Sequence, residues 1–225
     1  DPANAAVGGS STVRPVFDGD PFAKDNGLPD GEATAHDRAL AVLKVALVNL
    51  DRLHADPTTG VLLDSAQLTA GSVVRTPHAT TTEVAYALIG LRTAYRSLTS
   101  QLTLYSNSTP DSVATATALD ATSLQSIPGG VTLAQRLQQL IKAQADFLAT
   151  KLLDDAGLAK NGFNLQTQTS DSSAVTVEAQ AAAVRGLLEA YLATSNATYR
   201  SRAQAAYAVL EKRFYEPTLR IYRHQ

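Results

Sequence analysis

Apolar residues recur at spacings of three and four positions along most of this chain, and that spacing is typical of amphipathic helices. In the clearest stretch Val84, Leu88, Leu91 and Tyr95 follow one another at increments of 4, 3 and 4. The pattern predicts helices at about 35–54, 81–98, 132–153, 175–194 and 198–214, and a short extended segment at 219–222. Residues 1–33 lack this periodicity and are rich in glycine, proline, aspartate and serine, so we expect an extended arm or linker there.

The fourth predicted helix repeats the second. The pattern Ala-x-x-Gly-Leu-x-x-Ala-Tyr has its glycine first at Gly90 and again 96 positions later at Gly186. A helical segment, an Asp/Gly turn and a polar loop precede each copy in the same order, which indicates a helical-hairpin repeat. Because glycine inside a helix costs about 1 kcal/mol relative to alanine, we expect both glycines to lie where helices pack closely. A segment rich in serine and threonine at about 106–130 is interpreted as an insertion.

Paired helices, an Asp-x-x-Gly turn at 154–157 and a helix ending in Gly-Leu-x-x-Ala-Tyr resemble the α/α-toroid superfamily. That superfamily includes six-hairpin glycosidases and N-acylglucosamine 2-epimerase-like proteins. The resemblance covers about residues 35–225 and implies an all-α fold for residues 34–225. In that fold antiparallel helical hairpins form part of an α/α toroid or a short helical-pair array. A closed toroid of six hairpins needs a longer chain, so we expect one end of the repeat to be open.

Composition and charge exclude some functions. The net charge of −2 and the isoelectric point near 6.1 argue against nucleic-acid binding, which needs a concentrated basic surface. No apolar run is long enough to span a bilayer. Cysteine, methionine and tryptophan are absent, which excludes disulfides and a thiolate nucleophile. A chain without sulfur suits an oxidising compartment, so an extracytoplasmic location (periplasmic, cell-surface or secreted) is predicted; a simple compositional bias is the alternative.

The start of the second predicted helix is a candidate ligand site. Its candidate ligand-binding residues are Arg75, His78 and Tyr86, and its candidate catalytic residues are Glu83 and, in the repeat, Glu178. If the two repeated helices line a toroid, their N-termini face its cavity, where the helix dipole favours an anion. The two glutamates then supply carboxylates for acid–base chemistry. Because Thr80 and Glu83 have capping-box spacing, a purely structural role for Glu83 is the alternative.

The predicted arm contains a candidate metal site. Oxygen ligands around turn glycines suit a hard cation such as calcium, and the candidate ligands are Asp18, Asp20, Asp25, Asn26, Asp30 and Glu32. The stretch 25–32 resembles the calcium-binding repeats of the thrombospondin type-3 kind. It departs from their pattern, since Phe22, Lys24 and Ala33 fall at expected ligand positions. A flexible acidic linker is therefore the alternative, and no other cofactor is predicted.

Two functions remain from the sequence. The missing catalytic signatures favour a non-catalytic, exported binding or accessory protein that holds a partner protein or ligand on a helical-repeat surface. An open repeat end exposes apolar surface, so a protein partner or self-association is expected there. The alternative is a carbohydrate-active enzyme of the toroid class, acting as a hydrolase, lyase or epimerase.

Overall fold

The computed structural model describes residues 46–47, 49–70, 72–99 and 133–223. Contacts divide the chain into two units, one of Asp1–Leu50 with Ala94–Arg136 and the other of Asp51–Thr93 with Leu137–Gln225. The second unit holds most of the described residues, and the candidate site lies within it. The predicted arm (1–33) and the predicted insertion (106–130) lie outside the described residues.

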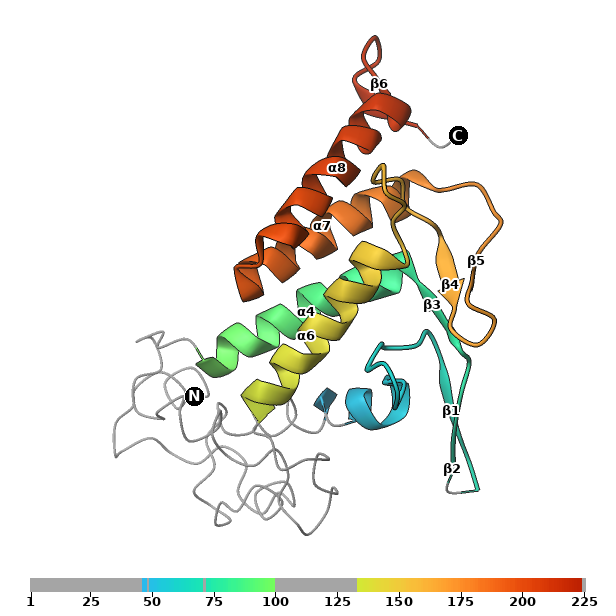
Figure 1. The fold of residues 1–225 in the computed structure, drawn as a ribbon, viewed down its shortest axis with the longest axis vertical. Coiled ribbons are helices and arrows are strands. Elements are labelled where there is room, and N and C mark those ends of the chain that lie inside the picture. Colours follow the sequence, from blue (N-terminus) through green and yellow to red (C-terminus); the bar gives the residue numbers. More distant parts are fainter. Residues whose placement is uncertain (1–45, 48, 71, 100–132, 224–225) are drawn as a thin grey trace, which may run out of the picture. The chain divides into compact units, whose positions relative to one another are not determined.

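The hydrophobic spacing predicts the helices well (Figure 1). The α-helices are α4 (Thr81–Thr99), α6 (Leu133–Thr150), α7 (Val177–Thr194) and α8 (Ala197–Phe214), and each predicted boundary lies within three residues of the observed one. Of the first predicted helix the structure describes only the end, which closes in the π-helix η1 (Leu50–His54). The rest of that helix, residues 35–45 and 48, lies outside the described residues.

Short polar side chains explain where α7 and α8 begin. The Thr176 hydroxyl accepts a hydrogen bond from the Ala179 N–H at 3.0 Å, and the Asn196 side-chain oxygen accepts one from the Thr198 N–H at 3.0 Å. Each bond satisfies one of the backbone donors that a helix N-terminus leaves without an intrahelical partner.

The predicted helical fold is confirmed, but the fold is not all-α, because short strands connect the helices. They are β1 (Ala66–Thr69), β2 (Ser72–Arg75), β3 (His78–Thr80), β4 (Gly162–Asn164), β5 (Thr169–Ser170), β6 (Tyr215–Glu216) and β7 (Ile221–Tyr222). β1 and β2 form one hairpin, β6 and β7 form another, and β3, β4 and β5 form a sheet in that order. Strands of two to four residues are too short to display an alternating pattern, so the sequence analysis interpreted most of them as polar loops. The fold is mostly helical with small sheets.

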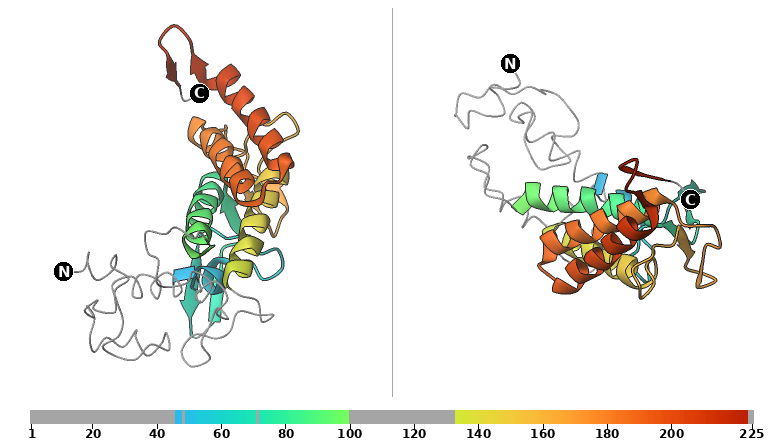
Figure 2. Two further views of the ribbon diagram at one scale, coloured as in Figure 1. Left: turned by 90° about the vertical axis from the view of Figure 1, so that its left-hand side faces the viewer. Right: turned by 90° about the horizontal axis from the view of Figure 1, so that it is seen from above.

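The helices of the second unit enclose an apolar core. α7 and α8 lie side by side (Figure 2). The side chains that contribute most are almost fully buried: Val84, Ala85, Leu88 and Leu91 of α4; Leu137, Leu140, Ile141 and Leu148 of α6; Ala183, Leu187 and Ala190 of α7; Ala203, Ala206 and Leu210 of α8. Within the part of the chain that the structure describes, no helix is both long and apolar enough to cross a membrane.

The prediction that helices pack closely at the repeated glycines is confirmed for Gly186 and is wrong for Gly90. A Cβ atom on Gly186 would lie 2.9 Å from both Cα and Cβ of Ala85 in α4 and 3.0 Å from a methyl carbon of Leu148 in α6. Gly90 is exposed, and a Cβ atom on it would meet nothing within 4 Å among the described residues. Ala85 and Gly90 are five residues apart, which is about 140° around a helix, so they cannot both face α7.

A buried ion cluster also joins α4 to α7. Glu189 of α7 is 4% exposed, and its Oε2 lies 2.5 Å from Arg92 Nη1 of α4. Its other oxygen lies 2.6 Å from Nη2 of Arg185, which is largely exposed one turn earlier on α7. A carboxylate taken out of water needs such partners, and Arg92 is the one that Glu189 meets inside the interface.

Candidate functional site

The sheet of β3, β4 and β5 joins the loops that precede α4 and α7. Its strands are antiparallel, with His78 opposite Asn164 and Thr80 opposite Gly162. Because successive residues of a strand point to opposite faces, Ala79 and Phe163 lie on the face away from His78. Both are buried, and the Phe163 ring meets the Phe147 ring of α6 edge-on with centroids 5.7 Å apart. The core therefore anchors one face of the sheet and leaves the polar face available for a site.

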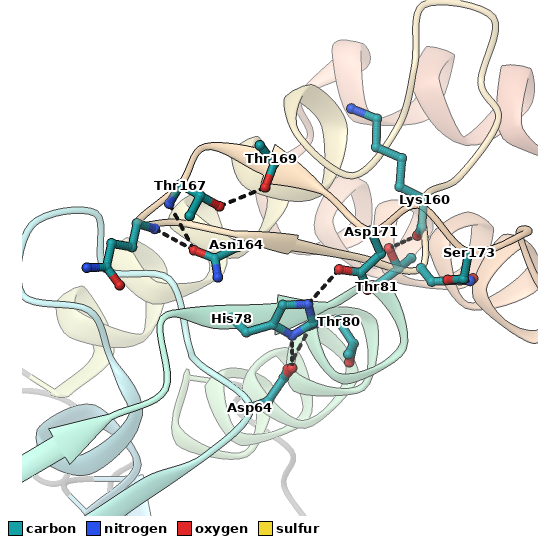
Figure 3. Close-up of polar contacts among 12 residues, drawn as sticks. Asp64, His78, Thr80, Thr81, Lys160, Asn164, Thr167, Thr169, Asp171 and Ser173 are labelled. Carbon is teal, nitrogen blue, oxygen red and sulfur yellow. Dashed lines mark hydrogen bonds and ion pairs between the residues drawn. The ribbon is translucent and has the colours of Figure 1, made fainter.

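On the polar face the His78 ring lies between two carboxylates (Figure 3). Its Nδ1 is 2.6 Å from Asp64 Oδ2, and its Nε2 is 2.9 Å from Asp171 Oδ1. Asp64 comes from the segment before β1, and Asp171 directly follows β5. The side chains of Asp64, His78 and Asp171 are 22%, 25% and 32% exposed, so solvent and small ligands reach all three. We call these three residues the Asp–His–Asp cluster.

The two carboxylates favour a positively charged ring. An ionised carboxylate only accepts hydrogen bonds, so bonds at both ring nitrogens require both to carry hydrogen. Burial by itself lowers the pKa of His78, but the hydrogen bonds to Asp171 and Asp64 and the charges of those carboxylates act in the opposite direction. Their sum raises the pKa of His78 above its ordinary value of 6.5. The site therefore favours the protonated imidazole between the two carboxylates.

Backbone hydrogen bonds fix the Asp64 carboxylate and the backbone of Asp171. Asp64 Oδ1 accepts a hydrogen bond from the Thr80 N–H at 2.8 Å, and the Asp64 N–H donates to the His78 carbonyl at 3.0 Å. The Asp171 N–H donates to the Gly162 carbonyl at 3.0 Å. A Cβ atom on Gly162 would lie 2.6 Å from Asp171 Oδ2 and from His78 Cε1, so only glycine leaves room for this pair. The cluster is held rigidly by two loops that are far apart in the sequence.

Asp171 keeps one carboxylate oxygen for chemistry. Both oxygens of Asp64 are used, one by Thr80 and one by His78, whereas only Oδ1 of Asp171 is hydrogen-bonded to another described residue. Oδ2 of Asp171 is thus able to accept a proton or a ligand hydroxyl while Oδ1 holds the carboxylate in place. A fixed carboxylate with one unused oxygen is suited to general acid–base catalysis.

Of the predicted ligand-binding residues, only His78 lies in the cluster. Arg75 donates from Nη2 to the Arg52 carbonyl at 2.6 Å, and its Nε is buried without a hydrogen-bond partner among the described residues. Arg75 thus connects β2 to η1. The Tyr86 side chain is half-exposed on α4, and no hydrogen bond joins it to the cluster in the described structure.

Glu83 and Glu178 are exposed in the first turns of α4 and α7. The Glu83 N–H donates to the Thr80 hydroxyl at 3.3 Å, which is the first half of the predicted capping box. The second half is absent, because the Thr80 N–H donates to Asp64 instead. Neither glutamate side chain is hydrogen-bonded to another described residue, so a catalytic role for them stays a prediction.

Within the described ranges no group of three or more acidic, histidine or cysteine side chains is placed to hold a metal ion. The Asp–His–Asp cluster does not qualify, since both ring nitrogens that would ligate a metal are hydrogen-bonded to carboxylates. The six predicted calcium ligands between residues 18 and 32 lie outside the described residues.

The sequence analysis did not identify Asp64 and Asp171. They stand 14 positions before and 93 positions after His78, and no motif has that spacing. One weak signal exists in retrospect, because Gly162 and Asp171 flank a short segment rich in threonine and glutamine that resembles a hairpin. Nothing in that signal indicates that the segment pairs with β3.

Comparisons with known proteins give limited similarity. No family model matches the chain, and no curated protein matches it. Among solved structures, cellobiose 2-epimerase from Spirochaeta thermophila DSM 6192 is 14% identical over 81% of this chain and 56% of its own, with a TM-score of 0.33. D-mannose isomerase is 16% identical over 83% of this chain and 55% of its own, with a TM-score of 0.31. The chain thus spans a little over half the length of either structure.

Both matches have low identity and a low TM-score, and the resemblance to the α/α-toroid superfamily stays a prediction. Similarity at this level assigns neither a family nor an activity to the chain. Any function therefore has to be argued from the Asp–His–Asp cluster and its surroundings.

Proposed function

We propose that this protein is a carbohydrate-active enzyme of the isomerase or epimerase type, with Asp171 as its acid–base group. The observation that supports this is the unused Oδ2 of Asp171, on a part-exposed carboxylate that His78 holds in position. In isomerisation Asp171 takes a proton from the carbon next to a sugar carbonyl and returns it to the former carbonyl carbon, while the proton of the neighbouring hydroxyl moves to the carbonyl oxygen. This reverses the order of the two functions expected from the sequence, which placed a non-catalytic protein first.

Hydroxyl and amide side chains around the cluster favour a polyhydroxylated substrate. Asn164, Thr167, Thr169 and Ser173 lie near the cluster on the same side of the sheet (Figure 3), and all but Asn164 are exposed. Such groups both donate and accept hydrogen bonds, as sugar hydroxyls do. Aromatic side chains for stacking are few, since the chain has no tryptophan, so recognition here depends on hydrogen bonds.

The arrangement of the carboxylates favours proton transfer over glycoside hydrolysis. Glycosidases place two carboxyl groups on opposite sides of a scissile bond, about 5–10 Å apart, with the substrate between them. Here Asp64 and Asp171 both bond to one imidazolium, which occupies the space between them. A single available carboxylate is sufficient for aldose–ketose isomerisation, because one base can move the proton between adjacent carbons on the same face of the substrate. Epimerisation also requires that the deprotonated intermediate turn over before the proton returns.

The test is exchange of carbon-bound hydrogen in deuterated water. Free sugars, with cellobiose and D-mannose in the panel because the two matched structures are named for them, are incubated with the protein and followed by proton NMR. We expect loss of the proton next to the carbonyl for at least one sugar, and loss of that activity in Asp171→Asn. Glu83→Gln and Glu178→Gln are matched controls that should remain active. Absence of exchange across the panel contradicts the proposal.

The second candidate is the binding or accessory protein predicted from the sequence. It is favoured by Leu188 and Leu192, which are exposed on α7 at 38% and 58%. Exposed apolar side chains one turn apart form a surface that a partner helix can bury. Light scattering on the wild type and on Leu192→Asp tests this function, since a partner or self-association through α7 should be lost in the variant.

Two further expectations from the sequence stay proposals. An extracytoplasmic location is supported by the absence of cysteine, and fractionation of the natural host with an antibody against the protein tests it. Calcium binding by the segment 18–32 predicts a melting temperature that falls on chelation, and an unchanged value removes it.

A further inference from the structure

Three segments of the chain adopt the same turn after a helix. They are the first turn (55–62), the second turn (153–159) and the third turn (215–222). Each is closed by an antiparallel pair, Ala55 with Leu62, Leu153 with Ala159 and Tyr215 with Tyr222. Each also has a residue with positive φ, namely Gly60 at +73°, Gly157 at +93° and Arg220 at +54°.

The hydrogen bonds inside the turns correspond as well. A carboxylate in the second position accepts a backbone N–H of the same turn: Asp56 from Thr58 at 3.2 Å, Asp154 from Leu158 at 2.8 Å and Glu216 from Thr218 at 3.2 Å. After each turn a backbone N–H donates to the carbonyl of the residue directly before the turn: Leu63 to His54, Lys160 to Leu152 and Arg223 to Phe214. The three turns are therefore copies of one structural unit.

A buried glutamine binds each of the first two turns. Gln144 of α6 accepts a hydrogen bond from the Leu62 N–H at 2.9 Å and donates to the Gly60 carbonyl at 2.8 Å. Gln180 of α7 accepts from the Ala159 N–H at 2.8 Å and donates to the Gly157 carbonyl at 2.9 Å. Both glutamines are fully buried, and both stand in an Ala-Gln-Ala sequence, at 143–145 and 179–181. The small neighbours allow the helix to approach the turn closely.

The third turn has no such cover among the described residues. Ile221 and Tyr222 are 47% and 45% exposed, whereas the corresponding Val61 and Leu62 of the first turn are 2% and 6% exposed. In an antiparallel ladder, hydrogen-bonded pairs alternate with non-hydrogen-bonded pairs. Phe214 and Arg223 form a hydrogen-bonded pair, so the next pair, Tyr215 and Tyr222, is not hydrogen-bonded, and the Tyr222 N–H points away from β6. The Tyr222 N–H and the Arg220 carbonyl thus correspond to the two groups that Gln144 binds in the first turn.

The chain also contains a third Ala-Gln-Ala sequence, at 203–205 of α8. Its Gln204 is exposed and forms no hydrogen bond with another described residue. Tyr207 and Ala208 follow it on the exposed face of α8, and Glu211 continues that face toward the third turn, where it accepts a hydrogen bond from the Tyr222 hydroxyl. One face of α8 therefore carries Gln204, which binds no turn among the described residues, and ends at the third turn, which no glutamine among the described residues binds.

We propose that this face binds a second copy of the chain, with Gln204 of each copy bound to the third turn of the other. Most soluble homo-oligomers are twofold dimers, in which one self-complementary surface meets itself. Gln204 lies ten residues before the end of α8 at Phe214, which is about 15 Å along the helix. A twofold axis near Ala208 brings each Gln204 opposite the partner's third turn, and the small side chain there permits close approach of the two helices.

Sedimentation velocity over a series of protein concentrations tests the proposal. We expect a dimer for the wild type at about 100 µM that dissociates on dilution. Gln204→Glu keeps an acceptor for the Tyr222 N–H but cannot donate to the Arg220 carbonyl, so the dissociation constant should rise about tenfold or more. Ile221→Asp introduces a charge into the interface and should leave a monomer. Both positions are exposed in a single copy, so circular dichroism should show an unchanged fold.

Matched controls come from the β1–β2 hairpin. Gln67→Glu and Leu68→Asp make the same kinds of change at exposed positions, and the dimer should persist in both. Amide exchange adds a local readout, because the Tyr222 N–H should exchange more slowly at concentrations where the dimer forms. A monomeric wild type at about 100 µM overturns the proposal, and so does a dimer that neither Gln204→Glu nor Ile221→Asp weakens.

Discussion

The repeated glycines allow a matched test of the helix packing, because the same substitution should have opposite effects at the two positions. In Gly186→Ala the new methyl group would lie 2.9 Å from the Cα of Ala85, which is a backbone atom that cannot move without moving α4. Overpacking of this kind costs about 1–3 kcal/mol, and alanine regains about 1 kcal/mol of helix propensity. We therefore expect the free energy of unfolding to fall by up to about 2 kcal/mol.

In Gly90→Ala the methyl group meets nothing within 4 Å among the described residues, so only the propensity gain remains. The free energy of unfolding should rise by about 0.5–1 kcal/mol. Urea unfolding followed by circular dichroism at 222 nm measures both variants with the same slope, provided that the transition is two-state. A Gly186→Ala variant that is more stable than the wild type would refute the close contact between α7 and α4. A Gly90→Ala variant that is less stable than the wild type would contradict the open surroundings of Gly90.

Three further changes test other contacts. Because the pKa of His78 is raised in the folded state, protonation of His78 stabilises the fold fully below the unfolded value of 6.5, and this effect is lost as the pH rises through the raised value. The difference in stability between the wild type and His78→Gln should therefore be greatest at acidic pH and shrink on titration to alkaline pH. A difference that grows with pH contradicts a protonated His78. Gln180→Leu leaves a buried backbone donor and acceptor of the second turn unsatisfied and should cost about 2–4 kcal/mol in urea unfolding, against less than about 0.5 kcal/mol for the exposed Gln67→Leu. Glu189→Gln leaves Arg92 without its carboxylate and should cost about 2–4 kcal/mol, whereas removal of the exposed Arg185 should cost less than about 1 kcal/mol; equal effects would show that the buried ion pair does not stabilise the interface.

The helices could be predicted from the sequence because each has enough turns to display its apolar face. In α7, Val177, Val184, Leu188 and Tyr191 have the helical spacing that predicted the helix, although the face that the structure buries carries Ala183, Leu187 and Ala190. The extended segment predicted at 219–222 contains β7. The other strands could not be predicted, since β5 and β6, for example, have two residues each and a pattern of two positions has no period. Their pairing also depends on partners distant in sequence, such as His78 with Asn164, which local patterns do not encode.

The same limit explains why the packing at only one of the two glycines was predicted correctly. The two copies of the motif are identical at the positions that define it, yet the neighbours of each helix differ. α7 passes over Ala85 and Leu148 at Gly186, whereas no described residue approaches Gly90. A repeat in sequence therefore indicates a shared backbone arrangement, but it does not require equivalent surroundings for every copy.

The candidate site follows from this asymmetry between the copies. In the sheet, β3 of the first copy pairs with β4 of the second, so His78 meets Asp171 from the loop of the following copy. A shift of 96 residues, which superposes the two glycines, places Asp171 over Arg75 and not over any residue of the Asp–His–Asp cluster. A cluster assembled from non-equivalent positions of two copies cannot be found by comparing the copies. It emerges only when the loops pair, and Gly162 is the residue that makes this possible, because any side chain there would separate His78 from Asp171.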